Sequence, residues 1–264
     1  NIARLRGISA GHRFVGERLL TVPWIAEGDL GGLALAERFG YRQVRVEPFS
    51  PFANSDGELE IEGEVLGLIW DGTGYGPDGT IWGGEILLGD YQGFTRMAHF
   101  QPVAIPGGEH AVREPWRNLV AHLRAAFGDR WPQEIAGTPV ADMLAAKPTD
   151  LIDKMIAQGV NAPLASSAGR LFDAVAAALG IAFDRQHYEG QAAMELEALS
   201  GHQRGAGGYP AAISKDGVIS WSPLWTALLS DLRAGVDRTT IAARFHLGLA
   251  HVLTKVAMRV ASDG

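Results

Sequence analysis

The fold depends on the stretch "DGTGYGPDGTIWGGEILLGDY", Asp71–Tyr91, which holds seven glycines and joins two apolar segments. The apolar run "VLGLIW", residues 65–70, precedes it and is typical of a buried strand that enters a turn. The pattern then predicts a second strand over residues 81–91 and a third over residues 95–105, which stops at a Pro-Gly-Gly turn. Together these segments predict a β-meander whose first connection is the glycine-rich stretch.

Helical spacing replaces the strand pattern from about residue 113. Apolar residues recur every three or four positions in segments 114–129, 165–180, 221–235 and 237–260. The expected caps and stops are Pro115 and Gly128 in the first segment, Ser166 or Ser167 and Gly180 in the second, and Ser222, Pro223 and Gly235 in the third. The order of strands first and then helices predicts an α/β class with α+β-like segregation.

The chain is expected to divide into three parts. Residues 1–57 have weak periodicity, residues 58–110 form a β-rich part with the glycine-rich loop, and residues 111–264 form a helical part of the same domain. The stretch "HQRGAGGYP", residues 202–210, is expected to be an exposed loop.

Composition excludes several classes of function. The chain has 264 residues and a formal net charge of -7, which argues against non-specific nucleic-acid binding because that binding rests on Lys and Arg. The absence of cysteine excludes disulfides, thiolate metal sites and a cysteine nucleophile within this chain. The sequence has no apolar run long enough to span a bilayer and no signal-peptide core, so we expect a cytoplasmic protein without membrane contact.

The glycine-rich stretch does not fit the common ligand-binding loops. Gly74, Gly76 and Gly79 have the G-x-G-x-x-G spacing, but strand formers follow where a dinucleotide fingerprint needs a helix. A calcium loop starting at Asp71 would have Trp82 at its twelfth position, where a carboxylate is required. The lysine-containing motif of a P-loop is absent from the sequence.

Two interpretations of the stretch stay open. In the first, Asp71 holds a divalent cation next to a nest of backbone N–H groups that binds phosphate oxygens. In the second, the stretch is a hairpin in which glycine supplies positive φ angles and Asp71 and Asp78 form Asx-turns.

Ordered blocks of the sequence resemble a known family. They are "DGTGYGPDGTIWGGEILLGDYQGF", "PGGEHAVREPWR", "ASSAGRLFDAVAAALGI", "YEGQAAMELEAL" and "IAARFH". In this order they look like the carbamoyltransferase domain of the HypF family, the maturation proteins for [NiFe] hydrogenases, which is related to the tRNA threonylcarbamoyl transferases. The resemblance covers roughly residues 65–250.

This resemblance implies an actin-like or RNase H-like ATPase fold and a carbamoyltransferase function. The domain would bind ATP or carbamoyl-adenylate and transfer a carbamoyl group to the C-terminal cysteine of a HypE-like maturation partner. Magnesium, iron or zinc are the metals that the resemblance implies. The alternative is a non-catalytic HypF-like paralogue or fragment that serves as a partner-binding scaffold.

The resemblance also assigns site residues. Asp71 matches the metal-contacting aspartate at a strand end. The nucleotide-binding positions are Gly72, Thr73, Gly74, Tyr75 and Gly76 at the phosphates, Asp173 at the ribose and Gly190 where the backbone meets the sugar. A carboxylate accepts two hydroxyl hydrogen bonds and only glycine permits so close a main-chain contact, so these residue types suit those tasks.

Two departures from the family pattern bear on activity. The family has a histidine-rich metal motif before the glycine-rich block, whereas residues 44–64 read "VRVEPFSPFANSDGELEIEGE" and no histidine stands between His12 and His99. One aspartate cannot replace the missing imidazole ligands, which argues against a bound metal. A nucleotide loop expected after "ARFH" is also absent, so we expect a truncated or divergent domain whose enzymatic activity stays open.

Single residues carry further alternatives. Arg113, Arg117 and Arg170 are candidates for phosphate or partner contacts, with ion pairs as the commoner alternative. His246 is expected to be a core or cap histidine, because no carboxylate partner stands at helical spacing.

Overall fold

The computed structural model describes residues 65–70, 74–90, 93–201 and 207–263, together with the backbone of three short upstream strands. Those strands are β1 (Ile8–Ala10), β2 (Leu20–Val22) and β3 (Arg45–Val46). The chain forms two compact units. The first contains Asn1–Trp70, Glu85–His99 and Thr254–Gly264, and the second contains Asp71–Gly84 and Phe100–Leu253.

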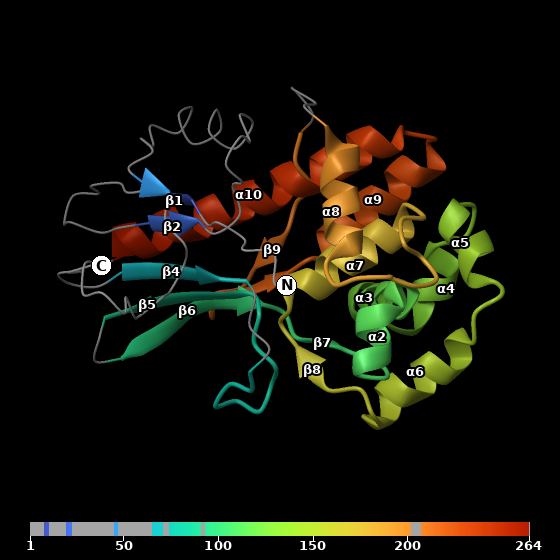
Figure 1. Cartoon of the computed structure of the whole chain (residues 1–264), viewed down its shortest axis with the longest axis horizontal. Coiled ribbons are helices and arrows are strands. Elements are labelled where there is room, and N and C mark those ends of the chain that lie inside the picture. Colours follow the sequence, from blue (N-terminus) through green and yellow to red (C-terminus); the bar gives the residue numbers. More distant parts are fainter. Residues whose placement is uncertain are drawn as a thin grey trace. The chain divides into compact units, whose positions relative to one another are not determined.

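The first unit is built on a mixed sheet. Its strands β4 (Val65–Ile69), β5 (Glu85–Gly89) and β6 (Phe94–Phe100) pair antiparallel in chain order and lie side by side (Figure 1). The upstream strands extend this sheet in the order β3, β1, β2, β4, with β2 parallel to β4. The predicted β-meander is therefore confirmed.

The second predicted strand begins later than its sequence pattern suggested. The strand starts at Glu85, not at Ile81, because residues 83–84 form a bend. Gly84 in this bend lies so close to its neighbours that a Cβ there would be 2.2 Å from the Ser166 carbonyl oxygen. Ile81 instead forms isolated bridges with Tyr75 and Ala165. Likewise the third strand ends at Phe100, and Val103–Ala104 form a separate strand, β7, paired with β8 (Leu164–Ala165).

The second unit is mainly helical (Figure 1). Its helices are α2 (Glu109–Arg113), α3 (Pro115–Phe127), α4 (Trp131–Glu134), α5 (Pro139–Leu144), α6 (Thr149–Gln158), α7 (Ala168–Ala178), α8 (Gln191–Ser200) and α9 (Ser222–Arg233), with a 3-10 turn at Gly128–Arg130 and a hairpin of β9 (Ala212–Ile213) and β10 (Val218–Ser220). The long helix α10 (Arg238–Asp263) begins in this unit. In the part of the chain described, no helix is both long enough and apolar enough to cross a membrane.

Helices α3 and α7 form the centre of the helical unit. Leu119 and Leu123 of α3 and Leu171 and Val175 of α7 are fully buried. Because α7 also carries the buried alanines Ala174, Ala176 and Ala177, neighbouring helices can approach its backbone closely. The buried Asp173 in the middle of α7 therefore lies in a largely apolar environment.

Most of the predicted helix ends are confirmed. Helix α3 has Pro115 at its first position and Gly128 as its C-cap, and the Ser167 side chain accepts a 3.3 Å hydrogen bond from the Arg170 N–H at the start of α7. The expected Ser222 cap is wrong by one residue, because Trp221 is the N-cap of α9 and Ser222 lies inside the helix.

The described part of the stretch 202–210 is a loop that is only partly exposed, because Gly207 and Pro210 are exposed and Tyr209 is buried. Residues 202–206 lie outside the described residues, but Tyr209 is only 4% exposed. Its hydroxyl donates a 2.6 Å hydrogen bond to Asp231 Oδ2. Gly208 lies against Gly248 of α10 so closely that a Cβ on Gly208 would be 2.5 Å from the Gly248 nitrogen. Close backbone packing, which only glycine permits, thus explains Gly208.

Candidate functional site

Asp173 is a buried carboxylate in the middle of α7. Its exposed fraction is 2%, and two amides point at it: Gln186 Nε2 donates to Oδ1 at 3.1 Å, and Asn118 Nδ2 donates to Oδ2 at 3.4 Å. Arg170 Nη1 lies 2.8 Å from Oδ2 but makes no hydrogen bond of good geometry. Burial raises the pKa of Asp173 from 3.8 to about 6, and the attraction of Arg170 and the Gln186 bond offset the rise only in part.

Gln186 joins Asp173 to the start of α8. Its Oε1 accepts a 3.0 Å hydrogen bond from the Ala192 N–H in the first turn of that helix, while its Nε2 donates to Asp173 and to the Val112 carbonyl. The structure therefore brings the predicted ribose-side residues Asp173 and Gly190 to one place, with Gln186 between them.

Gly190 is the N-cap of α8 and has a left-handed backbone with φ 77° and ψ 2°. Most side chains are strained in this conformation, which accounts for the glycine. A Cβ at this position would have no heavy atom within 4 Å. The face of Gly190 that would carry a side chain is therefore open, as a close backbone contact to a ligand requires.

The glycine-rich loop is organised around Asp78. Its Oδ1 accepts hydrogen bonds from the Thr80 N–H at 3.0 Å, the Thr80 hydroxyl at 2.8 Å and the Trp82 indole N–H at 3.0 Å. The Thr80 N–H bond is an Asx-turn, and Gly79 has a φ of 76°. The turn interpretation is thus confirmed for Asp78.

Gly76 meets a side chain of its own loop. A Cβ on Gly76 would lie 2.0 Å from Trp82 Nε1, so the indole occupies the space beside this glycine. Gly74, by contrast, faces open space and accepts a 3.0 Å hydrogen bond at its carbonyl from the Trp82 N–H. Tyr75 between them is 70% exposed. Of the predicted phosphate-side glycines that the structure describes, Gly74 is therefore the accessible one.

The loop is attached to the N-terminus of α7. The Ser166 N–H donates to the Ile81 carbonyl at 3.0 Å, and the Ala168 N–H donates to the Gly83 carbonyl at 2.8 Å. Since Arg170 and Asp173 follow on the same helix, the loop and the buried carboxylate share one rigid support.

The remaining site predictions concern residues that the structure does not describe. Asp71, Gly72 and Thr73 lie outside the described residues, so their assignments to metal and phosphate stay predictions. Among the residues that are described, no group of three or more His, Asp or Glu side chains could hold a metal ion.

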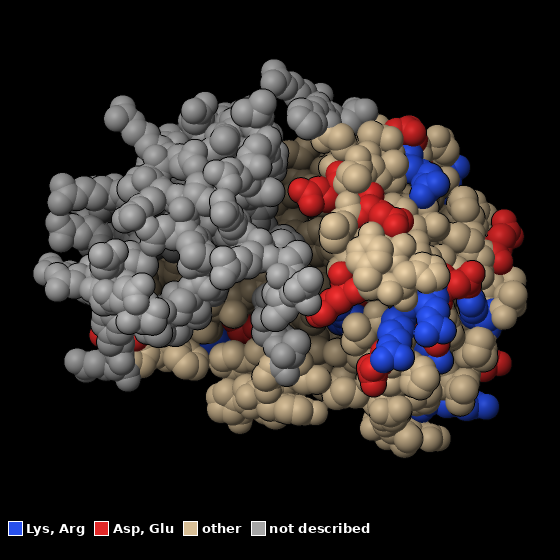
Figure 2. Space-filling model, in the orientation of Figure 1, with Lys and Arg blue, Asp and Glu red and all other residues tan. Residues whose placement is uncertain are grey.

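Ion pairs involve all three arginines that were candidates for phosphate contacts. Arg113 pairs with Glu109, Arg117 Nε lies 2.6 Å from Glu114 Oε2, and Arg170 pairs with Asp173. Figure 2 shows acidic and basic side chains interspersed over the face of the helical unit that it draws, as surface ion pairs require.

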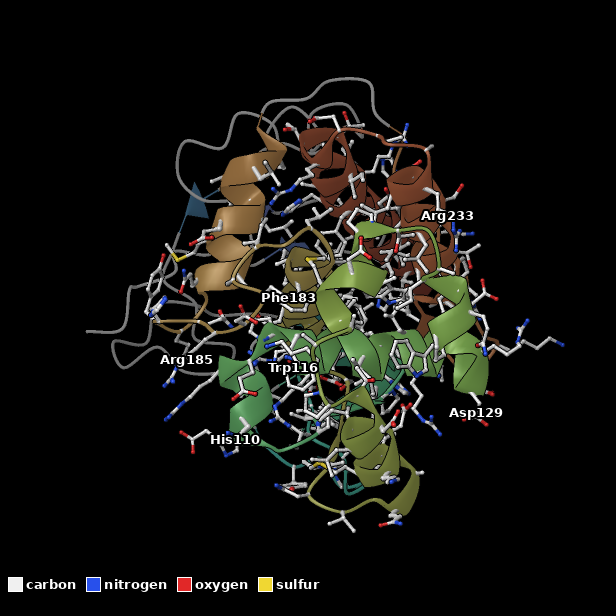
Figure 3. All side chains as sticks on the ribbon, turned by 90° about the vertical axis from the view of Figure 1, so that its right-hand side faces the viewer. His110, Trp116, Asp129, Phe183, Arg185 and Arg233 are labelled. Atoms are coloured by element: carbon white, nitrogen blue, oxygen red, sulfur yellow. The ribbon has the colours of Figure 1, made fainter. Side chains whose placement is uncertain are left out.

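An aromatic and cationic cluster lies next to these pairs. The Trp116 N–H donates to the Phe183 carbonyl at 3.2 Å, and both side chains are labelled in Figure 3. The Lys147 ammonium stands 5.3 Å from the Trp116 ring centre and 5.5 Å from that of Phe183, and it pairs with Asp184 at 2.6 Å. Cation-π contacts of this kind stabilise the junction of α3 with the segment before α8.

Sequence reasoning missed Asn118 and Gln186. Asn118 is 1% exposed and stands on the apolar face of α3 between Trp116 and Leu119, so a lone amide within an apolar stripe was a usable signal. Gln186 lies in a segment without periodicity and gave no comparable signal. His246 is half-buried inside α10, with Nδ1 2.8 Å from the Ala242 carbonyl and its ring against Phe172, so it packs at the edge of the core and caps no helix.

Comparison with known proteins relates this arrangement to the HypF proteins. The carbamoyltransferase HypF of Rhodobacter capsulatus is 44% identical over 203 residues, which are 76% of this chain and 25% of that protein. A crystal structure of full-length HypF in the phosphate- and nucleotide-bound form superposes with a TM-score of 0.69 at 31% identity, covering 77% of this chain and 26% of the other. The structure of T. kodakarensis HypF gives a TM-score of 0.66 at 30% identity, with 76% and 27% covered.

The similarity to these structures confirms the predicted fold class of strands followed by helices. In each HypF relative the similarity is limited to one part of the protein. The chain spans about a quarter of the length of the HypF proteins it matches here. The family model described as carbamoyltransferase, Kae1-like domain, second subdomain, matches residues 67–264, which is 198 of the 264 residues. The chain therefore belongs to the family of Kae1-like carbamoyltransferase domains and corresponds to their second subdomain.

Proposed function

We propose that this chain is the nucleotide-side part of a carbamoyltransferase domain in [NiFe] hydrogenase maturation. It binds ATP or carbamoyl-adenylate and serves transfer of the carbamoyl group to the C-terminal cysteine of a HypE-like partner. The observation that carries the proposal is that Gln186 links the two residues, by hydrogen bonds to Asp173 and to the first turn of α8 beside Gly190. The solved HypF structure that this chain resembles contains a bound nucleotide.

The proposed roles follow from the chemistry of the two residues. The ionised Asp173 carboxylate accepts hydrogen bonds from ribose hydroxyls, and the open face of Gly190 lets the sugar reach the backbone. The Asn118 contact of 3.4 Å is the weaker of the two amide contacts to Asp173, so it is the one that a ribose hydroxyl would replace. Asp173 and Gly190 bind and orient the nucleotide and take no part in bond breaking.

In the transfer step the thiolate of the partner attacks the carbamoyl carbon. The bond from that carbon to the adenylate oxygen breaks, and the nucleotide phosphate leaves with the electron pair. Since this chain has no cysteine, the attacking sulfur belongs to the partner.

The divalent metal implied by the family does not fit the residues of this chain. Asp71 alone is too small a ligand set, and no histidine stands between His12 and His99 to complete it. We therefore assign no step of the proposed reaction to a metal.

A second candidate function is a non-catalytic scaffold that binds the maturation partner. The absent histidine motif favours it. ATP binding distinguishes the two functions, because a scaffold needs the surface that binds the partner but no nucleotide site.

Calorimetric titration of the full chain with ATP, with and without magnesium, tests the proposal. The informative variant is Gly190→Asn, because asparagine tolerates the left-handed backbone yet places a side chain on the open face. Gly159→Asn is the matched control, since Gly159 also has a left-handed backbone, φ 64°, and open space around it, at the end of α6. We expect Gly190→Asn to weaken ATP binding about tenfold or more and Gly159→Asn to leave it unchanged.

The outcomes separate the two functions. Binding that is lost only in Gly190→Asn supports the carbamoyltransferase. A chain that binds no ATP but still binds a purified HypE-like partner is a scaffold. Equal ATP binding in both variants would place the nucleotide elsewhere and refute the assignment of Gly190.

A further inference from the structure

The Gln186 side chain uses every one of its hydrogen-bonding groups to join three segments. Nε2 donates to the Val112 carbonyl at 2.9 Å and to Asp173 Oδ1 at 3.1 Å, and Oε1 accepts from the Ala192 N–H at 3.0 Å. Its own backbone N–H donates to the Arg113 carbonyl at 2.7 Å. The residue is 7% exposed, so these bonds are shielded from water.

For Asp173, Gln186 is the donor with the best geometry. The Asn118 contact is longer, at 3.4 Å, and Arg170 Nη1 is close to the carboxylate without forming an aligned hydrogen bond. A hydrogen bond to the charged form favours that form, so Gln186 keeps the buried carboxylate ionised more than its surroundings alone would.

For Gly190, Gln186 supplies the cap that glycine lacks. The first N–H groups of a helix need acceptors, and the N-cap Gly190 provides no side-chain hydrogen bond. Gln186 Oε1 satisfies the Ala192 N–H from outside the helix. The left-handed turn at Gly190 is thereby fixed at a set distance from Asp173.

We propose that Gln186 is the positioning residue of the nucleotide site: its amide holds the Asp173 carboxylate and the Gly190 turn together so that the ribose meets both at once. This inference rests on the proposed function, because it assumes that the ribose binds between these two residues. Gln186 itself acts through its neighbours and does not touch the nucleotide.

The groups around Asp173 make the role measurable. Arg170, on the same helix, is the charged group in contact with the carboxylate among the residues described. The neighbouring elements face it with the neutral amides of Asn118 and Gln186. Removal of the Gln186 Nε2 donor is therefore expected to change the pKa of Asp173 directly.

Two substitutions of Gln186 distinguish its bond to Asp173 from its bond to the Ala192 N–H. Gln186→Glu keeps an acceptor for the Ala192 N–H but loses the donor to Asp173 and places a second carboxylate beside it. Gln186→Met has similar length and loses both bonds. Gln191→Met is the matched control, because the Gln191 side chain accepts from the His187 N–H at 2.7 Å and donates to Glu195 without contacting Asp173.

Three readouts are needed on the full-length chain. The Asp173 pKa comes from unfolding curves at several pH values, as the difference between each variant and its Asp173→Asn counterpart. Amide hydrogen exchange reports the Ala192 N–H. Calorimetry with ATP reports nucleotide affinity, and circular dichroism confirms that each variant is folded.

We expect the Asp173 pKa to rise in both Gln186 variants and Ala192 protection to fall only in Gln186→Met. ATP affinity should drop about tenfold or more in both, with Gln191→Met unchanged in all three readouts. An unchanged Asp173 pKa overturns the inference, and so does an ATP affinity that survives both substitutions while the wild type binds. If the wild type binds no ATP, the proposed function itself fails, and the positioning role fails with it.

Discussion

The indole of Trp82 lies against the backbone of Gly76, so close that a methyl group on Gly76 would be 2.0 Å from Trp82 Nε1. The same indole N–H donates to Asp78 at 3.0 Å. Glycine is therefore needed at position 76 because the Trp82 side chain fills the space beside it, although the spacing of the loop suggested phosphate binding. The loop holds its own shape through side-chain contacts.

Gly76→Ala should destabilise the protein by about 1–3 kcal/mol, because the new methyl group displaces the indole and breaks its bond to Asp78. Gly74→Ala is the matched control, since a Cβ there meets nothing within 4 Å. Urea unfolding curves should show a cost close to zero for Gly74→Ala. Equal costs for the two substitutions would contradict the packing described for Trp82.

Gly248→Ala should destabilise the protein although alanine is the better helix former. The methyl group would lie 2.4 Å from the Tyr209 carbonyl oxygen, so helix α10 and the segment at Gly208 must separate. Gly169→Ala, inside α7, has only Ser167 Oγ at 3.6 Å and should be neutral or stabilising by up to about 1 kcal/mol. Thermal melts should show a lower midpoint for Gly248→Ala and an unchanged or higher midpoint for Gly169→Ala.

Tyr209→Phe should cost about 1–2 kcal/mol, because the Tyr209 hydroxyl donates to a charged acceptor, Asp231. Arg244 Nη1 also contacts Asp231 Oδ2, at 2.5 Å, so the carboxylate stays paired in the variant. For this reason the cost should be clearly smaller than that of Arg244→Met in the same unfolding assay. A larger loss for Tyr209→Phe would show that the hydroxyl matters more than the ion pair.

The pH dependence of stability should contain two opposing contributions. Burial lowers the pKa of His122 from 6.5 to about 3, so the unfolded chain binds a proton there that the folded chain does not, and stability falls as pH drops below 6.5. The raised pKa of Asp173, about 6, acts the other way, because the folded chain binds the extra proton and stability falls as pH rises from 3.8 to 6.

Single substitutions should reveal each contribution. Relative to wild type, His122→Gln should gain stability as pH falls from 6 to 4, and Asp173→Asn should gain stability as pH rises over the same range. Each difference should change by no more than about 1.4 kcal/mol per pH unit. A flat difference for either variant in urea titrations at pH 4, 5 and 6 would rule out the titration assigned to that residue.

Long helices with clear ends could be predicted from the sequence. Helices α3 and α7 combine an apolar face with Pro115 or Ser167 at the start and a glycine after the end. Helices α4 and α5 were missed because they are short, with no side-chain cap in either. Segments of this length depend on tertiary packing more than on local pattern.

The site could be predicted only in part. Asp173 and Gly190 were assigned by family resemblance, and their connection required Gln186, whose partners Val112 and Ala192 are separated along the chain. The Asx-turn at Asp78 followed from local chemistry, since donor and acceptor are two residues apart. Contacts between distant residues leave no periodic pattern, which is why Asn118 and Gln186 were not foreseen.

Each of the two compact units is built from separate segments of the chain, which limits how the protein can be truncated. The boundaries fall at residues 70/71, 84/85, 99/100 and 253/254, and the last of them lies within α10. A single cut therefore cannot release either unit whole, and a stop codon before residue 254 removes a part of the first unit. Protease nicking near residue 253 would divide one helix between two fragments.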